Sequence, residues 1–181
     1  MATYATQTEL EAGLEVVRAA PRDQGVVELI VRRPAVDERE VVEEAELSLE
    51  DGLVGDNWSA RGLSGGRPAN TDAQLTVMNA RAAELAAGGR ERWPLAGDQL
   101  YVDLDVSAEN LPPGTRLAVG SAVIEVTAEP HTGCKKFSTR FGFETLEYFN
   151  SPEGRSLNLR GISTRVVAPG VVRAGDAVRR L

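Results

Sequence analysis

The sequence of 181 residues predicts a mainly β protein, a barrel or a sandwich with a few short helices. First, β segments follow one another about every 8 to 12 residues after Gly97, a spacing typical of these folds. Second, the turns LPPGT, AVGSA, APGV and RAGDA supply Gly or Pro where a hairpin needs special backbone angles. Third, this length suits one sizeable core, so we expect a single domain over residues 1–181.

The first third of the chain predicts one helix and then strands. In TELEAGLEVVRAAP (8–21), Leu10, Leu14 and Val17 recur at helical spacing, and Pro21 ends the pattern. GVVELIVRRPA (25–35) is a β-rich run, and REVVEEAELSL (39–49) alternates well enough to be its partner or a later strand.

The middle of the chain predicts a loop, a strand and a small helix. Residues 59–73, SARGLSGGRPANTDA, are rich in Gly and lack periodicity, which indicates a loop, and loops of this length are often functional. QLTVMN (74–79) is a short strand, and Asn79 is placed to cap the helix ARAAELAAGG, which Gly88 can end.

The last part of the chain predicts five strands and one aromatic helix. The strands are QLYVDLDVS (99–107), TRLAVG (115–120), SAVIEVTA (121–128), STRVVAPG (163–170) and DAVRRL (176–181). Phe143, Leu146, Tyr148 and Phe149 fit a short helix that ends at NSPEG. The cysteine therefore lies in a loop just after a strand, before this helix.

Composition excludes several functions. There are 20 Lys and Arg against 27 Asp and Glu, a net charge of −7 that argues against a nucleic-acid surface. No apolar run approaches the roughly 20 residues of a membrane helix, and the N-terminus lacks a secretory pattern. We expect a cytoplasmic protein with no membrane partner, in which the single cysteine stays reduced.

The stretch EPHTGCKKF (129–137) holds the only cysteine, Cys134. Nearby cations favour the reactive thiolate, and here Lys135 and Lys136 follow directly, with Arg140 further on. Gly133 lets the backbone turn sharply before it. These features favour a functional thiol, and the alternative is a small buried side chain, since free cysteines are often buried.

The only histidine, His131, precedes Cys134 by three positions, and three interpretations use both residues. A Cys–His nucleophile pair is one, although such partners usually lie far apart in sequence. An H-x-x-C zinc half-site is another, but it needs further ligands and the chain has no other Cys or His. The third, which we favour, is a loop in which His131 hydrogen-bonds backbone or lines the mouth of a pocket.

Several segments resemble the MOSC domain, named for the C-terminal domain of molybdenum cofactor sulfurases, in its small stand-alone bacterial form. They are GLVGDNW (52–58), DAQLTVMN (72–79), residues 96–127, EPHTGCKKF, and the ending from residue 160 to residue 181. Their order carries the resemblance, which covers about residues 52–181. It implies a MOSC-type β-barrel with short peripheral helices, to which residues 1–51 add a helix and strands.

The resemblance also implies a function. In this family the single cysteine, here Cys134, is proposed to bind the metal of the molybdenum cofactor (molybdopterin), and some relatives reduce small N-hydroxylated compounds. The leading hypothesis is therefore a molybdenum-dependent oxidoreductase with a small-molecule substrate and an electron-donor protein. The alternatives are a sulfur carrier that holds a Cys134 persulfide from a sulfur-donor protein, and a non-catalytic module that binds an anion or a protein. Pyridoxal phosphate enters only because the family is fused to proteins that bind it.

By the same resemblance, the predicted cofactor site gathers residues from several segments around the thiol. Departures from relatives occur at GDNW, where they carry a histidine, and in their block GENL, which appears here as GDQL (97–100) and AENL (108–111). The predicted cofactor-binding residues are His131, Thr132, Gly133, Lys135, Lys136, Arg140, Arg160, Arg61, Arg67, Asp56 and Asn110.

Overall fold

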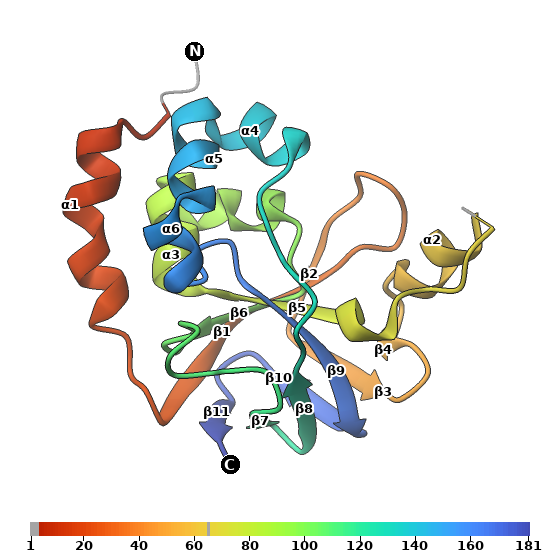
Figure 1. Cartoon of the computed structure of the whole chain (residues 1–181). Helices are drawn as coiled ribbons and strands as arrows, with labels where there is room; N and C mark the ends of the chain where they lie inside the picture. Colours follow the sequence, from red (N-terminus) through yellow and green to blue (C-terminus); the bar gives the residue numbers. More distant parts are fainter. Residues whose placement is uncertain (1–3, 65) are drawn as a thin grey trace.

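Seven strands form a closed barrel in the computed structural model, which describes residues 4–64 and 66–181 (Figure 1). Their order is β11-β7-β8-β9-β5-β6-β1, and the pairing of β1 with β11 closes the ring. Neighbouring strands are antiparallel except β5 and β6, which are parallel. The strands are β1 (Gln24–Arg32), β5 (Leu75–Asn79), β6 (Leu100–Asp103), β7 (Arg116–Val119), β8 (Ala122–Val126), β9 (Ile162–Ala168) and β11 (Ala177–Arg180).

Four further strands complete the β structure. β2 (Glu40–Val42) pairs with the end of β1, and a separate sheet has the order β10-β3-β4. That sheet joins β10 (Gly170–Arg173), β3 (Glu44–Ser48) and β4 (Gly52–Leu53).

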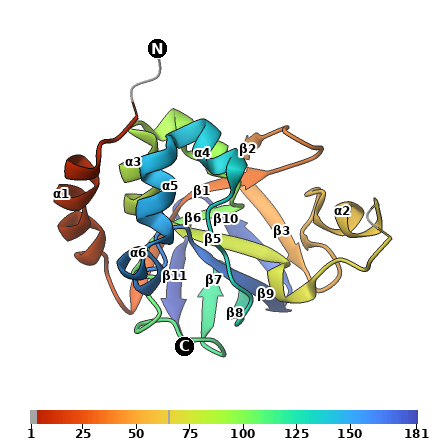
Figure 2. The same cartoon turned by 45° about the horizontal axis from the view of Figure 1, so that its top comes forward.

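Helices gather over one side of the barrel, whereas α2 lies apart on the other side (Figures 1 and 2). The gathered helices include α1 (Gln7–Arg18), α3 (Ala80–Ala87), α4 (Lys135–Phe141), α5 (Phe143–Asn150) and α6 (Pro152–Ser156). The remaining elements are α2 (Trp58–Ser64) and the 3-10 helices η1 (Thr71–Ala73) and η2 (Arg90–Ala96). None of the described helices has the length and apolar character needed to cross a membrane.

Two hydrophobic cores result from this arrangement. One fills the barrel and includes Leu75, Val77 and Leu100, while the other lies between the barrel and the helices and includes Met78 and Tyr101. Side chains alternate between the faces of a strand, so β5 and β6 serve both cores. These two strands are therefore almost wholly buried.

The predicted fold class is confirmed, and so are most elements. Asn79 caps α3, accepting a hydrogen bond from the Arg81 amide, and Gly88 ends that helix in the left-handed conformation. Leu10, Leu14 and Val17 are the buried face of α1. The last five predicted strands correspond to β6, β7, β8, β9 and β11.

Three expectations are corrected. The loop over 59–73 was wrong at its ends, because α2 and η1 lie there. The segment 39–49 is not one strand: β2 pairs with β1, and β3 belongs to the second sheet. Residues 135–141, expected as loop, form α4 because Phe137 and Phe141 bury a helical face in the outer core.

Candidate functional site

Cys134 is exposed and opens into a pocket of about 420 Å³ between α4, the β1–β2 loop and the segment 96–97. The loop after β8 brings it there, and Cys134 occupies the position just before α4. The thiol is therefore accessible, and the alternative of a small buried side chain is wrong. The pocket is lined by cationic side chains, namely Arg33, Arg39, Arg61, Lys136, Arg140 and Arg160, and by neutral residues that include Asn57, Thr76, Thr132 and Phe137.

Four of these arginines are held by four consecutive backbone carbonyls, those of residues 94–97. The pairs are Arg39 Nε with Pro94 O at 3.1 Å, Arg140 Nη1 with Leu95 O at 2.8 Å, Arg160 Nη2 with Ala96 O at 2.7 Å, and Arg33 Nη1 with Gly97 O at 3.0 Å. Each carbonyl is a neutral acceptor that orients a guanidinium without cancelling its charge. The end of η2 therefore organises the cationic wall of the pocket.

Carboxylates balance only part of this charge. Both oxygens of Asp56 accept hydrogen bonds from Arg33. Asp98 forms an ion pair with Arg160. Asp37 forms ion pairs with Lys136 and Arg140. Leaving Arg61 aside, five cations meet three carboxylates in the described contacts. Partial burial lowers the pKa of Arg39, and the nearby charges of Arg140 and Arg33 lower it further. An anion in the pocket would relieve this repulsion.

His131 belongs to a buried charged cluster under the pocket. Its Nε2 lies 2.7 Å from Asp98 Oδ1, and the other oxygen of Asp98 receives Arg160. Asp98 is fully buried, and burial alone would raise its pKa, but Arg160 and His131 outweigh that effect and lower it. Burial and Arg160 lower the pKa of His131, so the ring is neutral near pH 7 and donates its Nε2 proton to Asp98.

The neutral His131 predicts a pH dependence of stability. Its folded pKa lies below its unfolded value of about 6.5, so the unfolded chain binds more protons as the pH falls. The free energy of unfolding should drop between pH 7 and pH 5.5 in urea titrations, by at most about 1 kcal/mol, the limit for one such proton. Since the chain has no other histidine, this drop should vanish in His131→Gln. Equal slopes in both proteins would contradict the assignment.

The segment that presents Cys134 is fixed from α5. Asn150 makes two hydrogen bonds to Gly133: its Oδ1 accepts from the Gly133 amide at 2.9 Å, and its Nδ2 donates to the Gly133 carbonyl at 3.1 Å. A Cβ on Gly133 would meet Leu146 Cδ1 at 2.6 Å, so a larger residue there would require the end of the Leu146 side chain to shift. Asn150 thus holds the backbone next to Cys134 from outside the pocket.

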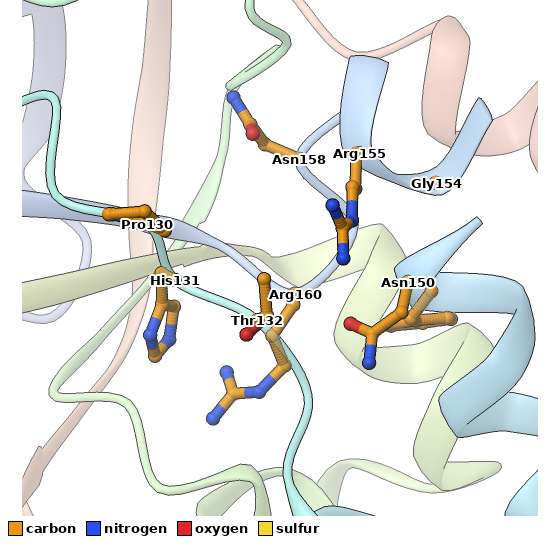
Figure 3. A pocket seen from close by; sticks show the side chains of 9 residues that line it. Pro130, His131, Thr132, Asn150, Gly154, Arg155, Asn158 and Arg160 are labelled. Atoms are coloured by element: carbon orange, nitrogen blue, oxygen red, sulfur yellow. The ribbon is translucent and has the colours of Figure 1, made fainter. Parts of the chain in front are cut away.

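A second, smaller pocket of about 180 Å³ lies beside His131 and Thr132 (Figure 3). Asn150 and Arg155 reach it from the α5–α6 region, and Arg160 lines both pockets. The guanidinium of Arg160 also lies over the Phe137 ring, with 5.1 Å between its carbon and the ring centre. Arg160, together with His131 and Thr132, therefore joins the cysteine pocket to its neighbour.

The structure brings together most of the predicted site residues. Cys134, His131, Thr132, Lys136, Arg140, Arg160 and Arg61 line one pocket. Asp56 lies beneath it, with its side chain fully buried against Arg33. Lys135 and Arg67 are exposed and do not line the pocket. Asn110 lies elsewhere, and its amide donates to the carbonyls of Arg22 and Asp105.

The sequence alone missed Arg33, Arg39, Asp37, Asp98 and Asn57. The first three lie on the β1–β2 connection, which carried no signal for a site. Asp98 lies in GDQL, a block already noted for its resemblance to GENL, so that motif contained the signal for a functional carboxylate. Within the described chain, no group of three His, Cys, Asp or Glu side chains is arranged to hold a metal ion.

A closed β-barrel with one exposed thiol in a cationic pocket defines a small, single-cysteine barrel protein. The family model of the MOSC domain matches residues 71–179, more than half of the chain. The chain belongs to the MOSC domain family.

Solved structures show the same fold. The YuaD protein from Bacillus subtilis superposes with a TM-score of 0.59 at 19% identity, covering 86% of this chain and 94% of that one. YiiM from Escherichia coli gives 0.56 at 21% identity, with 86% and 69% covered. YiiM from Geobacillus stearothermophilus gives 0.53 at 14% identity, with 90% and 74% covered. A search of curated proteins returned no match.

Proposed function

We propose that this MOSC protein binds the molybdenum cofactor, with Cys134 as a ligand of the metal, and acts as an oxidoreductase. The observation that carries the proposal is the exposed Cys134 thiol in a pocket whose wall holds six Lys and Arg side chains. A soft thiolate suits such a metal, and cations suit the anionic groups of the cofactor.

The residues present fit this group in two respects. Cys134 offers an exposed sulfur ligand, and Arg39, Lys136 and Arg140 offer donors for a phosphate. When bound, the cofactor would supply the redox chemistry, while the protein supplies ligation, orientation and charge. The family resemblance adds the substrate class, a small N-hydroxylated compound, and the need for an electron-donor protein.

The test measures the molybdenum and pterin content of the protein after production in a host that makes molybdopterin. We expect molybdenum by elemental analysis and pterin by fluorescence, both about stoichiometric, and at least a tenfold loss of metal in Cys134→Ser. Ser138→Ala is the matched control, because Ser138 follows on the same helix and, in the described contacts, its hydroxyl donates only to the Lys135 carbonyl. Its metal content should equal that of the wild type.

Other outcomes would overturn the proposal. Persulfide on Cys134 without molybdenum would favour the sulfur carrier, since a carrier needs only an accessible thiol. Absence of metal, pterin and persulfide alike would leave a module that binds an anion or a protein. Equal metal content in Cys134→Ser and wild type would remove Cys134 as a ligand.

A further inference from the structure

The β1–β2 loop places a carboxylate on the cations of the cysteine pocket. Asp37 Oδ1 lies 3.0 Å from Lys136 Nζ and 3.2 Å from Arg140 Nη2, although both cations are about a hundred positions away on α4. Figure 2 shows this loop, drawn in orange, beside α4. Asp37 is also the only carboxylate among the described residues that line the pocket.

The ion pairs of Asp37 with Lys136 and Arg140 are weak enough for another anion to replace Asp37. The side chains of Asp37 and Lys136 are about 60% exposed, and exposed ion pairs are weak because water and salt compete for them. Asp37 and its neighbours Ala35, Val36 and Glu38 are exposed, so few packing contacts hold the loop. By contrast, Arg33 and Asp56 at the base of the loop form a buried pair. The loop is thus firmly attached at its base and weakly attached at its tip.

We propose that Asp37 is an internal substitute for the ligand's oxyanion, and that an incoming phosphate or carboxylate group displaces it from Lys136 and Arg140 and releases the β1–β2 loop. A dianion would interact with the two cations more strongly than one shared carboxylate oxygen does. Arg39, which also lines the pocket and lacks a carboxylate in the described contacts, would then add a third donor.

The inference deepens the proposed function and rests on it only for the anionic nature of the ligand. The probe is inorganic phosphate titrated calorimetrically into cofactor-free protein at low ionic strength, with acetate in a parallel titration. Since this assay requires neither molybdenum nor the Cys134 thiol, its failure leaves the molybdenum measurement unaffected. The absence of molybdenum would likewise leave the phosphate result standing.

The decisive variant is Asp37→Asn, which removes the charge but keeps a residue that tolerates the left-handed backbone, φ 61°, found there. Phosphate affinity should rise about three- to tenfold, because two weak ion pairs no longer compete. Glu38→Gln is the matched control: it removes the same charge from the adjacent position, which makes no ion pair in the described chain, and should change affinity less than twofold. A gain with phosphate alone assigns the contact to a phosphate-bearing ligand, and a gain with acetate assigns it to carboxylates.

Amide hydrogen exchange in the loop provides the second readout. In the wild type, exchange of residues 35–38 should accelerate when phosphate is added, whereas in Asp37→Asn it should be fast from the start and unchanged by phosphate. Equal affinity gains in Asp37→Asn and Glu38→Gln would reduce the effect to general electrostatics and overturn the proposal. No gain with either probe, or no change of exchange in the wild type, would overturn it as well.

Discussion

Replacing Asp98 with Ala is expected to lower the free energy of unfolding by about 3 to 5 kcal/mol. The carboxylate is fully buried and receives both Arg160 and His131. Without it, the Arg160 guanidinium, only 8% exposed, stays buried with a carbonyl partner but no counter-charge. Removal of one partner from a buried pair is costly because the remaining charge is uncompensated. Urea unfolding at pH 7 measures the effect.

Asp103→Ala is the matched control. Asp103 lies at the end of β6, the strand that follows Asp98, and both of its carboxylate oxygens accept hydrogen bonds from Arg81. Both side chains of this pair are more than a quarter exposed. Solvent screens such a pair, so its loss should cost about 1 kcal/mol or less. Comparable losses in the two variants would show that Asp98 has no special role beneath the pocket.

The local features of the fold were predictable where a short-range rule applies. Asn79 could be recognised as a helix cap and Gly88 as a helix end because both act within one turn of α3. Strands with Pro or Gly turns were also predictable. α2 was not, because its Trp58 is held partly by a contact beyond the helix: its indole donates to the carbonyl of Asn70, while its amide donates to Asp56 two residues before it.

The site was predictable around Cys134 but not across the pocket. Lys136 and Arg140 are close in sequence to the thiol, and a helix keeps them close in space. Arg33 and Arg39 lie in the N-terminal part of the chain, far from Cys134 in sequence. Their side chains are oriented by the carbonyls of Gly97 and Pro94, and no sequence pattern reveals these contacts. His131 was predicted to hydrogen-bond backbone or to line the mouth of a pocket. It lines the pocket, but its ring bonds the Asp98 carboxylate and not backbone, which depends on how the barrel brings residues 98 and 131 together.

Asn110 shows why a motif can mislead about place. It lies in AENL, which resembles a family block, yet its side chain holds a turn by donating to two carbonyls and accepting from Arg180. The other half of the split block, GDQL, contains Asp98 and lies beneath the pocket. A polar residue in such a block either builds the site or stabilises a turn, and only the fold separates the two.

The second large effect is expected at Gly161, which connects the site to the barrel. Gly161 follows Arg160 with φ 109°, a conformation that side chains rarely adopt. A Cβ there would lie 2.6 Å from the Val77 carbonyl oxygen and 3.2 Å from His131 Cδ2. Backbone cannot move aside without disturbing the pairing of β5 with β9. Gly161→Ala should therefore lower the free energy of unfolding by about 3 to 5 kcal/mol, the sum of strain and overpacking.

Gly175→Ala separates the two contributions. Gly175 has a similar φ of 92°, but a Cβ there would meet no heavy atom of the described chain within 4 Å. It should cost only the strain, about 1 to 2 kcal/mol. If both glycine variants lose the same stability in urea unfolding, the close approach to Val77 is not what requires a glycine. A larger loss at Gly161 means that both the β5–β9 pairing and the position of His131 require the absence of a side chain at residue 161. The structure of the pocket then depends on the closure of the barrel.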